Sequence, residues 1–187
     1  MDAPTELCLT NEPDANAFIA KDSLGLLVGL VLHQQIPTEK AFHSPMVLRD
    51  RLGRDLDPAQ IANMDPEALE AVFKEKPALH RFPGSMAKRV QSVCEHVVET
   101  YDGSVAGIWE GVTTADQLME RLLAMPGFGE YKARIYIGVL AKRFGIKPKG
   151  FTKYLPTWPS IVDIASLDDL ADLKARKKAW KESKADS

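Results

Sequence analysis

Apolar residues recur at helical spacing along most of the chain. Between residues 24 and 32, leucines and valines repeat at positions i, i+3 and i+4 before Pro37 closes the run. Valines repeat in the same way in 86–101, which ends before Asp102-Gly103. The sustained alternation typical of strands does not occur. The pattern predicts an all-α protein with roughly seven to nine helices.

Residues that favour helix N-caps precede these periodic stretches. Asp57 and Asp65 are each followed by proline, whose missing N–H costs nothing in the first turn. Thr114 and Gln117 form a capping-box pattern. We expect the remaining caps or starts at Ser23, Thr38, Ser85 and Ser166, the last with Asp169. The least helical stretch, 145–160, holds three prolines and is expected to be a loop.

The composition bounds the class of protein. The chain has 187 residues, of which 45% are hydrophobic and 27% charged, as in one compact domain or two lobes sharing a core. Its longest apolar run is too short to span a bilayer, and its first residues lack the pattern of a secretory signal. Two cysteines are too few for a four-cysteine zinc or iron–sulfur site. We therefore expect a cytoplasmic protein without a membrane partner.

The net charge of −2 conceals an uneven distribution. Residues 1–141 carry 13 basic and 20 acidic residues, whereas residues 142–187 carry 11 and 6. A basic C-terminal end can attract phosphate locally. On its own, however, such an end is more often a solvated helix or a frayed tail.

The stretch "AMPGFGEYKARIYIGVLAKRFG", residues 124–145, joins two helical patterns through four residues, 126–129. So short a link predicts a tight helical hairpin. Glycine lets another backbone approach closely, and the helix that begins near Glu130 would present unpaired N–H groups to an anion. Lys132 in its first turn could add charge. The alternative is a plain corner between two helices.

The segment "MPGFGEYKA" resembles the helix–hairpin–helix signature of the HhH-GPD DNA glycosylases, the superfamily of endonuclease III and MutY. Residues 26–41 and 82–103 resemble two further stretches of that family in the same order, so the likeness covers 23 to about 145. It implies a two-lobed, all-α glycosylase fold. The core would be 23–144, with the hairpin at 114–144. The segments 1–22 and 145–187 would form a small second lobe and a basic C-terminal helix.

The resemblance also implies how the chain would hold DNA. In the family the hairpin grips the backbone while a target nucleotide turns out into a pocket, and a glutamine fills the gap in the stack. The implied DNA-binding residues are Gln34, Gln35, Lys88, Arg89, Gly127, Gly129 and Lys132, and the implied pocket residues are His33 and Tyr131. Alternatively, the two glutamines merely end a helix before Pro37, and His33 satisfies a local hydrogen bond.

Tyr131 occupies the place of the lysine nucleophile of bifunctional members. Because tyrosine cannot form a Schiff base, the resemblance implies a monofunctional enzyme without AP-lyase activity. Lys132, one step further along the helix, faces another direction and is interpreted as a phosphate contact.

The family's catalytic aspartate has no clear counterpart. Counting forward as the family does leads to Lys149 and Gly150, and Leu30 stands where MutY has a second acid. The nearest later acid is Asp163, which is the candidate catalytic residue or, alternatively, a polar residue ahead of a helix cap. No iron–sulfur cluster or other metal cofactor is expected, apart from a possible monovalent cation at the hairpin.

Three hypotheses follow, all with duplex DNA as the partner. The first is a monofunctional DNA N-glycosylase of base excision repair that acts on a damaged or mismatched base. The second is a binder of DNA lesions without catalysis. The third is a helix–hairpin–helix module that binds duplex without extruding a nucleotide.

Overall fold

The computed structural model describes residues 4–185, and these are almost entirely helical. Within that range the regular backbone consists of α-helices and short 3-10 helices, with one isolated bridge between Thr114 and Lys149. The α-helices are α1 Pro13–Lys21, α2 Ser23–Leu32, α3 Thr38–Leu52, α4 Pro58–Ala62, α5 Pro66–Lys74, α6 Pro83–Tyr101, α7 Ala115–Leu123, α8 Glu130–Arg143 and α9 Leu167–Ala185. The 3-10 helices are η1 Val105–Ile108, η2 Phe151–Tyr154 and η3 Ile161–Asp163. The prediction of an all-α fold is confirmed.

Several predicted helix starts are found with the expected caps. The carboxylates of Asp57 and Asp65 accept N–H bonds in the first turns of α4 and α5, with proline following each. Thr114 and Gln117 form the complete capping box of α7. Local side-chain chemistry therefore determined these boundaries.

Three starts differ from the prediction. Asp22, not Ser23, caps α2, because Asp22 keeps an extended backbone and its carboxylate accepts the N–H of Gly25 at 2.6 Å. Thr38 is already the first residue of α3, and α6 begins at Pro83, two residues ahead of Ser85. Proline at a first helical position explains the last shift, since its backbone is preset for a helix.

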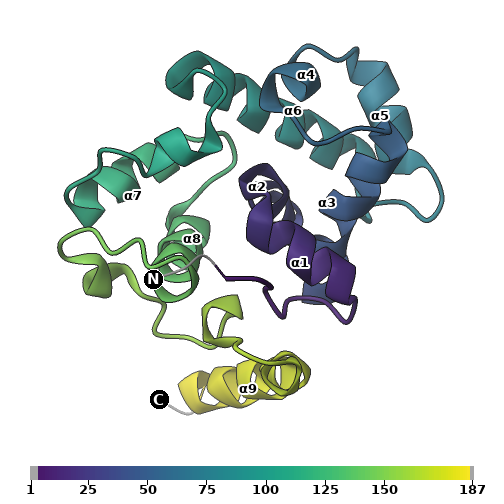
Figure 1. Ribbon diagram of the computed structural model, residues 1–187. Coiled ribbons are helices and arrows are strands. Elements are labelled where there is room, and N and C mark those ends of the chain that lie inside the picture. The colour runs from purple at the N-terminus through teal and green to yellow at the C-terminus, as the bar shows by residue number, and fades with distance from the viewer. Residues whose placement is uncertain (1–3, 186–187) are drawn as a thin grey trace.

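Helix α2 lies at the centre of the molecule (Figure 1). All of its residues after Ser23 are buried, and it packs against α1, α3 and α6. Helices α4 and α5 cover α6, while α7 and α8 form the predicted helical hairpin on the other side. A helix without a polar face must lie inside the molecule, so the end of α2 is held in place by packing.

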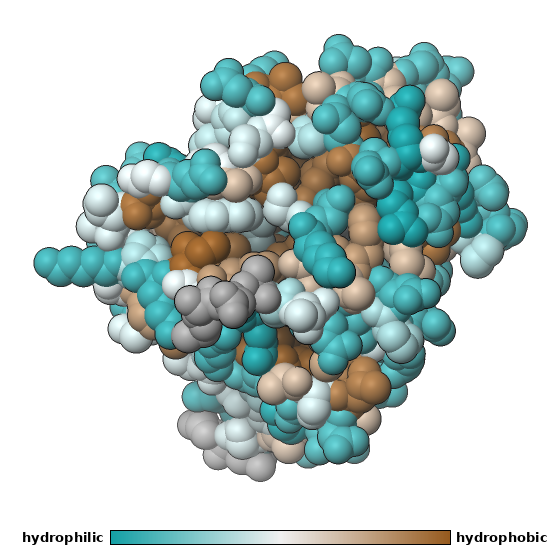
Figure 2. All heavy atoms as spheres, in the orientation of Figure 1, coloured by the Kyte–Doolittle hydropathy of each residue, from teal (hydrophilic) through white to brown (hydrophobic). Residues whose placement is uncertain are grey.

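One hydrophobic core joins both ends of the described chain. It extends from Leu7 and Leu9 in the N-terminal segment, through α2 and α8, to Leu170 and Leu173 of α9. On the face shown in Figure 2, hydrophilic residues form most of the outline and hydrophobic residues appear mainly in the recesses. Among the described helices none is by itself long and apolar enough to cross a membrane. Helices α1 and α2 meet that test only as a pair bent by 112°.

Candidate nucleic-acid interface

The link between α7 and α8 is built around two exposed glycines with different constraints. Gly127 has φ of +74°, and a Cβ there would lie 2.9 Å from Cδ of Arg89. Gly129 has an ordinary φ, and a Cβ there would meet open space. Phe128 between them is buried in the core and anchors the turn. The hairpin is thus fixed from inside while both glycines face outward.

The start of α8 is open to solvent. No side chain caps this helix at Gly129. The first N–H groups of a helix lack partners within it and carry a partial positive charge. The open space beside Gly129 lets an anion approach them closely.

A cleft of about 450 Å³ lies between the end of α2 and the start of α8. Most of the residues predicted for the site line it together. Its lining comprises Leu30, His33, Gln34, Gln35, Ile36, Gly127, Gly129, Tyr131, Lys132, Ile135 and Lys177. Segments almost 100 residues apart in sequence therefore meet in one cavity.

The two adjacent glutamines have different surroundings. The amide of Gln34 accepts a hydrogen bond from Arg89 at 3.0 Å and donates to the sulfur of Met86. The backbone carbonyl oxygen of Gln34 lies 3.0 Å from Nε2 of His80. Gln35 is exposed and has φ of +57°, a backbone conformation that costs energy for a residue other than glycine. Gln34 is thus held by the protein, and Gln35 is presented to the cleft.

His33 is half-buried at the same helix end. Its Nε2 lies 3.0 Å from the Thr38 hydroxyl, and its ring contacts that of Phe42. Burial, followed by the charges of Lys177 and Lys132, lowers the pKa of His33 to about 4. The imidazole is therefore neutral near pH 7.

Lys132 reaches back across the cleft to α2. Its Nζ donates to the carbonyl of Val31 at 3.1 Å and lies 5.4 Å from the centre of the Phe128 ring. Burial, and secondarily the charge of Arg89, lowers the pKa of Lys132 to about 8. This amine is anchored at the cleft wall, and it is only partly desolvated.

Two residues of the cleft region were missed by sequence reasoning. Lys177, from α9, lines the cleft, although the basic C-terminal end was interpreted only as a general source of charge. Trp158 stacks on Tyr131, with ring centres 5.0 Å apart and an interplanar angle of 14°. Trp158 lies in the irregular segment after α8 and Lys177 in the helix that follows it, so no local pattern indicates that either side chain returns to the hairpin.

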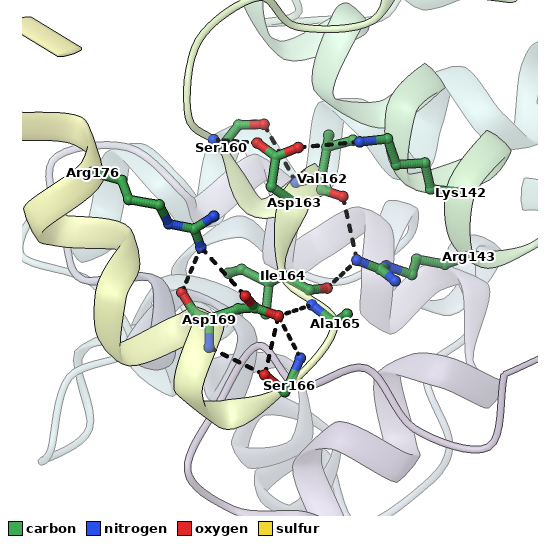
Figure 3. A network of polar contacts seen from close by, with 10 residues as sticks. All are labelled: Lys142, Arg143, Ser160, Val162, Asp163, Ile164, Ala165, Ser166, Asp169 and Arg176. Carbon is green, nitrogen blue, oxygen red and sulfur yellow. Dashed lines mark hydrogen bonds and ion pairs between the residues drawn. The ribbon is translucent and has the colours of Figure 1, made fainter.

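Three of the predicted site residues do not line the cleft. Arg89 adjoins it through Gln34 and Gly127, whereas Lys88 is exposed on α6. Asp163 is absent from the cleft lining and lies in η3, close to Lys142 and Ser160 (Figure 3). Its carboxylate accepts from Lys142 at 3.1 Å and from the backbone N–H of Ser160 at 3.1 Å.

The surroundings of Asp163 are those of a helix cap. Ser160 and Asp163 form a reciprocal capping box around η3, which orients the carboxylate toward its own backbone. No aspartate or glutamate is among the residues that line the cleft. The structure therefore does not bring the predicted catalytic acid to the pocket.

The family model for HhH-GPD superfamily base excision DNA repair proteins matches residues 28–179. The chain belongs to this superfamily. Comparison with curated proteins and with solved structures finds no match. The HhH-GPD match starts inside α2 and extends into α9, so it contains both walls of the cleft. Membership makes this a base excision DNA repair protein, and DNA its partner.

Proposed function

We propose that this protein binds damaged duplex DNA and receives one extruded nucleotide in the cleft between α2 and α8. The observation that carries the proposal is the meeting of Gln35, the hairpin glycines and Lys132 around one cavity. Its volume of about 450 Å³ lies within the range of small-ligand sites. Extrusion needs a grip on the backbone, a group that fills the gap in the duplex and a pocket.

Each of these parts has a candidate in the cleft. The open N-terminus of α8 at Gly129 suits a backbone phosphate. The exposed amide of Gln35 can occupy the vacated position and hydrogen-bond the unpaired base opposite. The exposed face of Tyr131 offers an aromatic surface against which a base or sugar can pack. These contacts do not depend on the base sequence of the DNA. Recognition would therefore rest on how easily the damaged nucleotide leaves the duplex.

Base release by a monofunctional N-glycosylase is the second candidate, favoured by membership of the superfamily. When the bond between base and sugar breaks, positive charge develops on the sugar. Stabilising this charge requires a nearby carboxylate or an equivalent negative group. Because Asp163 is bound to Lys142 and Ser160, the geometry favours lesion binding over base release through Asp163. Tyr131 at the family's lysine position supports the absence of AP-lyase activity. The expectations of no iron–sulfur cluster and of a possible monovalent cation at the hairpin stay predictions.

Binding measurements test the proposal directly. A duplex with a stable abasic analogue should bind at least tenfold more tightly than the intact duplex, because extrusion costs least where pairing is already lost. Gln35→Ala should remove most of this preference, while Gln60→Ala, an exposed glutamine on α4, should retain it. Equal affinity for both duplexes would mean that the protein does not extrude a nucleotide.

An assay of base release separates the two candidates. Duplexes with uracil, oxidised, alkylated or mismatched bases are incubated with the protein, and free bases are measured. We expect binding without release. Release that persists in Asp163→Asn would favour a glycosylase that uses another group. Release that Asp163→Asn abolishes would show that the η3 cap opens on DNA.

A further inference from the structure

Helix α9 is fixed firmly to the rest of the molecule at its start. Arg143, at the end of α8, donates to the carbonyls of Ile164 and Val162 (Figure 3). Asp169 accepts from the N–H groups of Ala165 and Ser166 at 2.9 and 3.0 Å. The first turns of α9 also bury Leu170 and Leu173 in the core. These contacts set the direction in which the helix runs.

The later turns of α9 carry a stripe of lysines. At about 100° per residue, these side chains fall within roughly 120° of the helix surface. The stripe consists of Lys174, Lys177, Lys178, Lys181 and Lys184. The acidic residues Asp168, Asp169 and Asp172 lie on the opposite side of the same helix. Apart from Arg176, which pairs with Asp169, and Glu182, which pairs with Lys178, charge is therefore segregated between two faces.

The lysine side chains of the stripe repel one another. Several of its lysines are three or four residues apart, a spacing at which like charges destabilise a helix. One ion pair, between Lys178 and Glu182 at 3.9 Å, relieves this repulsion only partly. The pKa of Lys177 is lowered by burial and then by the charge of Lys181. A line of anions along the stripe would remove the repulsion.

The stripe is continuous with the cleft. Lys177 is a member of the stripe and also lines the cleft, as Gly129 and Lys132 do. The other stripe lysines are exposed. An anionic chain held at the hairpin can therefore continue along α9 without crossing an acidic surface of that helix.

We propose that the lysine stripe of α9 binds the sugar–phosphate backbone that flanks the extruded nucleotide. This inference rests on the proposed function, and it extends the contact between protein and DNA beyond the cleft. From Lys174 to Lys184 the helix rises about 15 Å, which matches four to five base pairs along the duplex axis. Because phosphates carry no sequence information, the stripe would add affinity to one arm of any lesion-containing duplex.

The test removes charge from the stripe without touching the cleft. Lys174, Lys178 and Lys181 are replaced together by glutamine, and Lys177 is kept. The matched control replaces Lys21, Lys74 and Lys76, three exposed lysines outside α9, of which Lys74 also has an ion pair with a glutamate four residues away. Binding to a duplex with an abasic analogue is measured by fluorescence anisotropy at several salt concentrations.

The stripe variant should bind about tenfold more weakly near physiological salt, and the slope of log affinity against log salt should fall by about two. The control triple should retain the wild-type slope. Replacing the same three stripe lysines by arginine should also retain the wild-type slope. This variant distinguishes an effect of lost charge from an effect of altered folding. Far-UV circular dichroism verifies that α9 remains helical.

Trimming the duplex gives an independent measurement. Shortening one arm to about two base pairs, less than the span of the stripe, should weaken wild-type binding but change the stripe variant little. Shortening the other arm should affect both alike. If wild-type protein prefers the lesion and the stripe variant keeps its slope, the α9 inference is overturned and the proposed function stands. If wild-type protein binds no DNA, both are overturned.

Discussion

Lys132 shows how one side chain can be tuned by two opposing requirements. Its stem and amine are packed between Phe128 and the end of α2, which favours the neutral form and lowers its pKa to about 8. A phosphate at the hairpin would favour the charged form instead. The charged groups around it are Arg89 from α6 and Lys177 from α9, with neutral His33 at the end of α2. At this residue, therefore, proton uptake and DNA binding should be coupled.

This coupling predicts a pH dependence of DNA affinity. Below pH 7 the Lys132 amine is charged and attracts phosphate, and the attraction is lost as pH rises through about 8. We expect the affinity for an abasic duplex to fall several-fold between pH 7 and 9 at constant salt. Lys132→Arg, which keeps its charge throughout, should bind with little change over this range. A wild-type affinity that does not vary with pH would exclude the phosphate role.

The stability of the free protein should respond in the opposite direction. Because the unfolded lysine has a pKa of 10.5, the unfolded chain binds more protons than the folded one between about pH 8 and 10.5. The contribution of Lys132 to the free energy of unfolding therefore rises with pH in that window. Thermal melts of wild type and Lys132→Gln over the same range isolate this contribution.

At the scale of elements, the strongest local signals in the sequence were reliable. The capping residues of α4, α5 and α7 and the hairpin between α7 and α8 could be predicted because each depends on a few neighbouring residues. The cleft could be predicted in outline because the hairpin and the end of α2 both carry recognisable residues. Lys177 and Trp158 could not, since their positions depend on how the loop after α8 folds back.

The same local reasoning does not distinguish the two hairpin glycines, but their geometry does. Gly127 has a positive φ and lies against Arg89, so Gly127→Ala should lower the free energy of unfolding by about 1–2 kcal/mol. Gly129 has an ordinary φ and open space around it. Gly129→Ala should leave stability nearly unchanged and still weaken DNA binding, because its methyl group occupies the approach to the start of α8.

Chemical denaturation and anisotropy titration of the two variants, with Gly53→Ala as a positive-φ control away from the cleft, test this distinction. Gly53 ends α3, so its variant should lose stability and keep the DNA affinity of its folded fraction. Wild-type binding by Gly129→Ala would exclude a close phosphate contact at the hairpin.

At the scale of the whole molecule, carboxylates help to join the C-terminal elements, whereas none of them lines the cleft. The carboxylates of Asp163 and Asp169 are both used in the structure that joins α8, η3 and α9. The cleft itself receives amines, amides and aromatic rings. The chain belongs to the superfamily, while the one acid that sequence spacing offered for catalysis caps η3 and pairs with Lys142 of α8 instead.

This division predicts the behaviour of Asp163→Asn. Asparagine retains one oxygen for the Ser160 N–H but loses the charge that attracts Lys142, an exposed pair of modest energy. We therefore expect the free energy of unfolding to fall by about 1 kcal/mol or less, with unchanged affinity for an abasic duplex. Lys142→Gln should lower stability by a similar amount, and the double variant by less than the sum, because both single variants remove the same interaction. A loss of DNA affinity in Asp163→Asn that Lys142→Gln does not share would instead place this carboxylate in contact with DNA.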